Sequence, residues 1–327
     1  MRVKTIFLTI VIVFLLCSCS GVELEPPEGT GSGHAHGNGE DCTVKWAGIR
    51  ISTYGMRDSF GYENFPKETT MTGYAQKMAG CYEGSKGAYI LIVGENHELD
   101  DEDAYDSEKA GKHYCGLFFP VEGKYNYIRG RKNDKYESYL DKCDELGIDV
   151  WLQVESGDAD LVTLADLVMK QYSHHTCVKG FGIDVEWHQP VKGSDKGTPL
   201  SKKDAQRVLA KVREYNTSET DYTVFVKHWI KEWLPPRMQG LIYVNDSQQF
   251  GSMEEVVDDF SDWAATYAPQ PVMFQIGYEE DEWLWNKYAN PAKEFGQAIV
   301  DECKSGNDVG IIWVDFTLSQ VINKTNL

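Results

Sequence analysis

The sequence predicts an α/β fold built as a single (β/α)₈ barrel with a long insertion after the second strand. Past residue 42, eight short runs rich in β-branched and aromatic residues alternate with longer segments whose apolar residues recur every three or four positions. Strands that alternate with helices pair in parallel, and eight such units close into a barrel. A doubly wound open sheet is the alternative, but the sequence lacks the glycine-rich phosphate loop that such a sheet normally carries after an early strand.

The elements follow from these patterns in chain order. The eight predicted strands are 44–53, 88–94, 148–155, 180–187, 222–228, 240–246, 271–277 and 309–315. Helical spacing predicts helices within 134–147, 160–175, 201–216, 252–268 and 291–303, and several of these begin at Ser or Asp, as capped helices do. The segment 95–129 is predicted as the insertion, and long insertions of this kind usually wall a ligand cleft.

The N-terminal residues predict export and a lipid anchor. Residues 1–18 combine Arg2 and Lys4 with an apolar run that is too short to span a membrane, which is typical of a secretory signal. Leu16-Cys17-Ser18-Cys19 resembles a lipobox, which implies cleavage before Cys19 and lipidation of its thiol. An ordinary signal cleaved nearby is the alternative. The expected location is therefore the cell surface or the outer side of a membrane.

Residues 19–41 are rich in Gly, Pro, Ser and acids, which predicts a flexible tether, and the barrel domain is expected at 42–327. Six cysteines remain in that domain, and an even number in an exported protein predicts disulfides without fixing their pairing: Cys42, Cys81, Cys115, Cys143, Cys177 and Cys303. The formal net charge of −19 argues against nucleic acid as a partner.

Polar residues gather at the C-terminal ends of six predicted strands, where active sites of this fold lie. These residues are Glu155, Asp158, Asp184, Glu186, His188, Lys227, His228, Trp229, Asn245, Asp246, Gln248, Gln275, Tyr278, Trp313 and Asp315. We expect them to meet in one cleft, because desolvating so many polar groups is costly unless they are paired or used. Some could instead be structural, for example as a buried ion pair between Lys227 and Asp315.

The fourth strand carries the most informative pattern. Asp184, Glu186 and His188 lie two residues apart, so on an extended strand their side chains share one face and Trp187 points to the other.

This run, GFGIDVEWHQP, resembles the fourth-strand signature of the family 18 chitinases and the Asp-x-Glu strand of the family 25 lysozymes, both TIM-barrel glycoside hydrolases. The run GIIWVDF resembles the last strand of the chitinase barrels, and by that match Trp313 would form the floor of a sugar subsite. Over the chitinase pattern His188 falls where the catalytic glutamate is expected, whereas the lysozyme pattern fits Asp184 and Glu186 without substitution.

The resemblance implies hydrolysis of glycosidic bonds, which needs one carboxyl group as proton donor and a second as nucleophile or base. We expect Glu186 to be the donor with Asp184 supporting it, and Glu155, Asp246 or Asp315 to be the second carboxylate. The predicted substrate-binding residues are His188, Lys227, His228, Asn245, Asp246, Gln275, Tyr278 and Trp313.

The expected substrate is a cell-wall or extracellular polysaccharide, and no cofactor or metal is predicted. A metal site formed by Asp184, Glu186, His188 and His228 is an alternative. So is a non-catalytic glycan-binding or scaffold lipoprotein that keeps the barrel. The sequence has no GxSxG, HExxH or Walker motif to suggest other chemistry.

Overall fold

The computed structural model describes residues 39–61, 65–99, 111–191, 194 and 196–325. The predicted signal, Cys19 and nearly all of the predicted tether lie outside these residues, so export and lipidation stay predictions.

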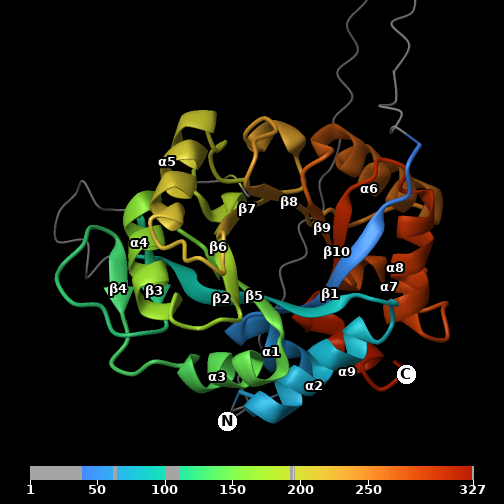
Figure 1. Ribbon diagram of the computed structural model, residues 1–327, viewed down its shortest axis with the longest axis horizontal. Helices are drawn as coiled ribbons and strands as arrows, with labels where there is room; N and C mark the ends of the chain where they lie inside the picture. Colours follow the sequence, from blue (N-terminus) through green and yellow to red (C-terminus); the bar gives the residue numbers. More distant parts are fainter. Residues whose placement is uncertain (1–38, 62–64, 100–110, 192–193, 195, 326–327) are drawn as a thin grey trace, which may run out of the picture. The chain divides into compact units, whose positions relative to one another are not determined.

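Eight parallel strands close into a barrel (Figure 1). They are β1 (Thr43–Ile51), β2 (Lys86–Glu98), β5 (Asp149–Val154), β6 (Val178–Asp184), β7 (Thr223–Lys227), β8 (Leu241–Asn245), β9 (Val272–Ile276) and β10 (Asp308–Trp313). Each strand pairs with the next in parallel, and β1 pairs with both β2 and β10, which closes the barrel. The predicted (β/α)₈ barrel is confirmed, and each of the eight predicted strands overlaps one of these strands.

Helices surround the strands (Figure 1). They are α1 (Thr53–Phe60), α2 (Glu68–Ala79), α3 (Glu137–Leu146), α4 (Leu161–Tyr172), α5 (Lys202–Arg213), α6 (Met253–Tyr267), α7 (Glu282–Trp285), α8 (Pro291–Glu302) and α9 (Leu318–Val321). Short 3₁₀ helices follow four of the strands: η1 (Val185–Trp187), η2 (Lys231–Trp233), η3 (Glu279–Asp281) and η4 (Asp315–Thr317). The five predicted helices correspond to α3, α4, α5, α6 and α8.

Helix capping agrees with the sequence pattern. The side chains of Asp160, Ser201 and Ser252 accept hydrogen bonds from backbone N–H groups in the first turns of α4, α5 and α6. No helix among the described residues is long and apolar enough to cross a membrane.

The segment after β2 differs from a plain loop. β3 (His113–Leu117) pairs antiparallel with the outer part of β2, and β4 (Ile128–Gly130) pairs with β3. β3 lies within the predicted insertion at 95–129 and β4 crosses its end by one residue; the sequence predicts neither as a strand. Residues 100–110 lie outside the described residues, so the insertion as a whole stays a prediction.

The inside of the barrel is apolar toward the N-terminal ends of the strands. Side chains at alternate strand positions form an inner cluster: Trp46, Ala88, Ile90, Trp151, Phe225, Ile242, Val244, Met273 and Ile312. Gly182 faces the Phe225 ring so closely that a Cβ atom there would lie 2.1 Å from ring atoms. Continuing the same alternation toward the C-terminal ends brings polar residues inward, which places the site.

One disulfide, Cys42–Cys303, joins the start of β1 to the end of α8, with Cα atoms 5.5 Å apart. Its two cysteines are 261 residues apart in sequence, so it ties the first and last strands of the barrel domain together. The other cysteines of the described chain, Cys81, Cys115, Cys143 and Cys177, are buried free thiols.

Candidate active site

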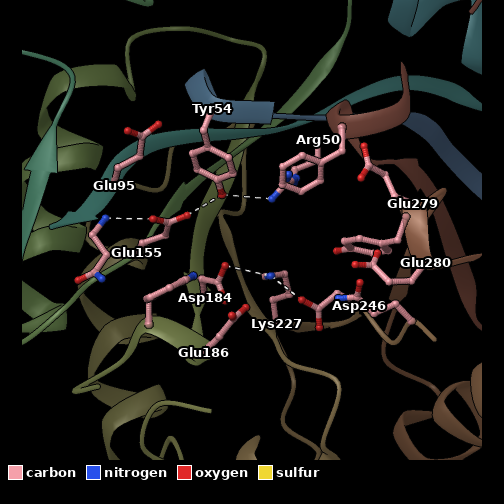
Figure 2. A pocket seen from close by; sticks show the side chains of 15 residues that line it. Arg50, Tyr54, Glu95, Glu155, Asp184, Glu186, Lys227, Asp246, Glu279 and Glu280 are labelled. Atoms are coloured by element: carbon pink, nitrogen blue, oxygen red, sulfur yellow. Dashed lines mark hydrogen bonds and ion pairs between the residues drawn. The ribbon is translucent and has the colours of Figure 1, made fainter. Parts of the chain in front are cut away.

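A cavity of about 510 Å³ lies at the C-terminal ends of the barrel strands (Figure 2). Its lining is rich in charged groups: Arg50, Tyr54, Glu95, Asn96, Glu155, Asp184, Glu186, Trp187, Lys227, Asp246, Gln248, Tyr278, Glu279, Glu280 and Phe316. Seven of the residues predicted from the strand ends are therefore brought together here: Glu155, Asp184, Glu186, Lys227, Asp246, Gln248 and Tyr278.

Lys227 lies between two aspartates in this cavity (Figure 2). Its Nζ atom is 2.9 Å from Oδ2 of Asp184 and 2.5 Å from Oδ2 of Asp246. Burial acts to lower the pKa of Lys227, but the two carboxylates outweigh it and raise that pKa well above its usual value. Lys227 therefore carries a positive charge at neutral pH.

Arg50 is held by a second buried ion pair. Its Nη2 and Nε atoms donate to Oδ1 of Asp315 at 2.5 and 3.1 Å. The other Asp315 oxygen accepts hydrogen bonds from the Ser52 backbone N–H and hydroxyl. Asp315 is fully buried and outside the cavity lining, so it positions Arg50 instead of facing a ligand. The suggested Lys227–Asp315 pair is wrong, because each residue has another partner.

Glu155 follows β5 and has fixed partners in the cavity. The Tyr54 hydroxyl donates to its Oε1 at 2.8 Å, and the Asn96 backbone N–H donates to its Oε2 at 3.0 Å. Burial and the charge of Asp184 raise the pKa of Glu155 to about 7, although these hydrogen bonds act to lower it. The pKa of Tyr54 is raised by burial, so its hydroxyl keeps its proton and donates.

Glu186 lies in η1, directly after β6, and is only partly buried. Burial raises its pKa to about 8, and the charge of Asp184 adds to the shift while Lys227 opposes it. Among the described residues none donates a hydrogen bond to its carboxyl group. A carboxyl group that is protonated near neutral pH and receives no hydrogen bond from the described residues is available to a ligand.

The predicted extended strand is wrong beyond Asp184. β6 ends there and the chain turns into η1, so the two-residue alternation no longer applies to the side chains that follow. Trp187 consequently lines the cavity, against the prediction. His188 is buried outside the cavity lining, with Nδ1 3.4 Å from the Ser156 hydroxyl, so its predicted contact with substrate has no structural basis.

Four other predicted substrate-binding residues have structural partners and do not line the cavity. Asn245 donates to Asp259 and accepts from the Ser247 backbone, and Gln275 accepts from the Tyr278 hydroxyl.

His228 and Trp313 are the other two. His228 accepts a hydrogen bond from the Ile230 N–H at Nδ1, which leaves Nε2 to donate to the Lys196 carbonyl. Burial lowers the pKa of His228 to about 4, so the ring is neutral. Trp313 is buried, packs edge-on against Trp285 and donates to Thr317, so it is not a subsite floor.

The suggested metal site of Asp184, Glu186, His188 and His228 is not formed. His188 and His228 point to other partners, and the metal-capable clusters found in the described part of the chain lie elsewhere.

Sequence reasoning missed the cavity residues contributed by the first two strands. Arg50 is the last residue but one of β1, and Glu95 and Asn96 directly follow Gly94, where the pairing of β2 with β5 ends. The signal that can find them is their position, because polar residues at the C-terminal ends of the first two strands face the same end of the barrel as those of the later strands.

The cavity floor has unused hydrogen-bonding capacity. Two of the lining residues have a buried carboxylate oxygen without a hydrogen-bond partner among the described residues: Oδ1 of Asp184 and Oδ1 of Asp246. Because such atoms are costly unless solvated or bound, the site suits a polar ligand with many hydroxyl groups.

No family model matches this sequence, and no curated protein matches it. The function is therefore inferred from the residues of the cavity.

Proposed function

We propose that this protein hydrolyses glycosidic bonds, with Glu186 as the proton donor and Glu155 as the second carboxylate. The observation that carries the proposal is the pair of carboxyl groups in one cavity, with pKa values raised to about 8 and about 7, above those of ordinary glutamates. Glycosidases need two carboxyl groups of opposite protonation at the working pH, and raised pKa values supply the acid.

Different surroundings support different roles for the two groups. Glu186 has no hydrogen-bond donor among the described residues and is the more weakly acidic, so it is the group that keeps its proton for the leaving oxygen. Glu155 receives two hydrogen bonds, which favour its ionised form and fix its orientation for attack or for activation of water. Asp315 is excluded as the second carboxylate because Arg50 and Ser52 occupy both of its oxygens.

Asp184 and Lys227 support the acid electrostatically. A buried carboxylate near Glu186 disfavours a second negative charge and so helps to keep Glu186 protonated. Lys227 offsets part of this effect, which keeps the pKa of Glu186 close to neutrality. This arrangement agrees with the Asp-x-Glu resemblance of the fourth strand.

The substrate in this proposal is a polysaccharide of a cell wall or extracellular matrix. The cavity combines polar atoms with the aromatic side chains of Trp187, Tyr278 and Phe316, the combination that sugar rings require. The proposed lipid anchor at Cys19 would hold the barrel at the outer side of a membrane, where such polymers are found.

The direct test is to incubate the purified protein with a panel of cell-wall and extracellular polysaccharides and to measure binding and new reducing ends. Glu186→Gln should lower turnover about a hundredfold to ten-thousandfold while leaving binding nearly unchanged. Glu279→Gln is the matched control, because Glu279 lines the same cavity but is exposed. Cleavage by Glu186→Gln at the wild-type rate would rule out Glu186 as the acid.

A non-catalytic glycan-binding protein is the second candidate. One observation favours it: His188 takes the place of the chitinase glutamate and does not line the cavity. Saturable binding of a glycan without any product over the whole panel would support this candidate and overturn the first. If the protein neither binds nor cleaves any glycan of the panel, both candidate functions are overturned.

A further inference from the structure

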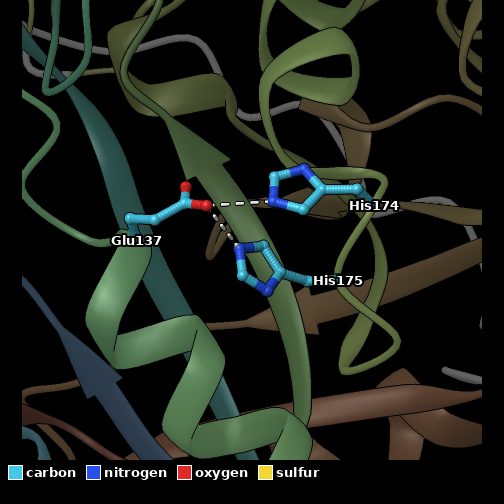
Figure 3. Close-up of side chains that lie close together, drawn as sticks. All are labelled: Glu137, His174 and His175. Atoms are coloured by element: carbon cyan, nitrogen blue, oxygen red, sulfur yellow. Dashed lines mark hydrogen bonds and ion pairs between the residues drawn. The ribbon is translucent and has the colours of Figure 1, made fainter.

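Three side chains gather on the outside of the barrel, where α3 packs beside the turn between α4 and β6. They are Glu137, in the first turn of α3, and the consecutive residues His174 and His175 in that turn (Figure 3). Oε1 of Glu137 lies 3.0 Å from Nε2 of His174 and 3.5 Å from Nε2 of His175. This cluster is separate from the cavity described above.

His175 is the informative member. Its side chain is only 2% exposed, and its Nδ1 atom lies 2.8 Å from Oδ2 of Asp144. A proton on Nδ1 that is donated to Asp144 leaves the lone pair of Nε2 facing Glu137 and His174. This Nε2 is buried and has no hydrogen-bond partner among the described residues. Burying a polar nitrogen in this way is costly unless another group binds it.

The three candidate ligand atoms all lie within 4.8 Å of one another, and two of their separations suit a tetrahedral zinc ion. Zn²⁺ bonds to histidine nitrogen and carboxylate oxygen are about 2.0–2.2 Å long, which places the ligand atoms of a tetrahedron roughly 3.3 Å apart. The two distances from Oε1 of Glu137 to the imidazole nitrogens, 3.0 and 3.5 Å, lie on either side of that value. Two imidazoles with one carboxylate are a ligand set that suits zinc.

The surroundings also suit a cation. Asp144 would orient His175 through its Nδ1–H, as carboxylates commonly do for metal-bound histidines. Asp141, whose Oδ1 lies 3.9 Å from the same nitrogen, adds negative charge. The side chains of Glu137 and His174 are 44% and 56% exposed, so an ion can enter from solvent.

The geometry points to a zinc site formed by Glu137 Oε1, His174 Nε2 and His175 Nε2, with the fourth position open to solvent. Such an ion links the start of α3 to the turn after α4. It should therefore stabilise the folded protein in proportion to the zinc concentration, because the unfolded chain does not hold the three ligands together.

The test uses full-length protein stripped of metal with a chelator. Its parent carries His34→Ala and His36→Ala, so that the two histidines of the predicted tether cannot contribute. Zinc affinity is measured by competition with a chromophoric chelator, and Co²⁺ is used to read the coordination geometry from its visible spectrum. The parent should bind one equivalent of zinc, show the strong visible absorption of four-coordinate Co²⁺ and gain thermal stability on adding zinc.

His174→Ala and Glu137→Gln should each weaken zinc binding at least tenfold and abolish the thermal shift. Both replaced side chains are exposed, so the variants should fold. His97→Ala, a half-buried histidine outside the cluster, is the matched control and should behave as the parent. The proposal is overturned if the parent takes up no zinc, or if both ligand variants keep its affinity and stoichiometry.

Discussion

The Nζ atom of Lys227 lies 2.9 Å from Oδ2 of Asp184, and both side chains are almost completely buried. Asp246, the residue directly after β8, contacts the same ammonium group, so one cation joins the C-terminal ends of β6, β7 and β8. Removing Lys227 would leave two carboxylates buried without a counter-charge.

Lys227→Met should therefore destabilise the protein by about 3–5 kcal/mol, the range found when one partner of a buried ion pair is removed. The measurement is the free energy of unfolding in denaturant at neutral pH. Lys45→Met is the control, because Lys45 pairs with Asp308 at 2.6 Å on the surface. This variant should lose less than about 1 kcal/mol of its free energy of unfolding. Equal losses in the two variants would contradict a structural role for the buried network.

The proposed mechanism predicts a narrow bell-shaped pH profile for kcat/KM. Glu155 must be ionised, so activity should rise as pH passes about 7, and Glu186 must be protonated, so activity should fall as pH passes about 8. The profile is measured on the substrate found in the polysaccharide screen. With an activated substrate whose leaving group needs no proton, Glu186→Gln should keep activity and lose the alkaline decline. An optimum near pH 5 would argue against both assignments.

The same raised pKa values predict a cost in stability at high pH. A carboxyl group whose pKa is higher in the folded state than in the unfolded state contributes stability below the unfolded pKa of about 4.5, and that contribution is lost as pH rises through the folded pKa. Glu186→Gln should therefore raise the melting temperature at pH 9 and change it little at pH 4.5.

A gain of about 2 kcal/mol in the free energy of unfolding would raise the melting temperature by roughly 4–8 °C in a domain of this size. Glu280→Gln, an exposed residue of the same cavity, is the control and should have little effect at either pH. A stabilisation of Glu186→Gln that is equal at both pH values would point to packing instead of ionisation.

The fold could be predicted from the sequence because each strand carries its own local signal, and eight parallel strands have few ways to pair. The inward direction of Asp184, Lys227 and Asp246 followed from alternation along single strands. The position of His188 could not be predicted in this way, because the chain leaves β6 at Asp184 and enters η1.

The sequence also could not predict which acidic residues form ion pairs with the buried lysine. The sequence shows that Lys227 needs an acid, but choosing Asp184 and Asp246 over Asp315 depends on distances between strands. The zinc cluster was missed for the same reason, since Glu137 and the His174–His175 pair meet only when α3 packs beside the turn after α4.

The proposed anchor has a separate test. Cys19→Ala should move the protein from the membrane fraction to the soluble fraction, because a thiol is needed for lipid attachment. Fractionation followed by immunoblotting measures this, and Cys17→Ala is the control, because Cys17 would be removed with the signal. Unchanged membrane retention of Cys19→Ala would contradict the lipid anchor without affecting the proposed activity.

Trp187 offers a test of sugar binding that is independent of the proton donor. It lies beside Glu186 in η1 and is half-buried at the cavity, so its ring can pack against a sugar at the site of cleavage. Trp187→Ala should raise KM roughly tenfold, equivalent to about 1.4 kcal/mol of lost binding, with a smaller change in kcat.

Trp283→Ala is the matched control, because Trp283 is 49% exposed, lies under the Lys287 ammonium group and is not part of this cavity. If the Trp283 variant loses as much affinity as the Trp187 variant, the glycan must extend well beyond the cavity or bind elsewhere. If neither variant loses affinity, the Trp187 ring has no part in binding, and the polar side chains around Asp184 and Asp246 must supply the contacts.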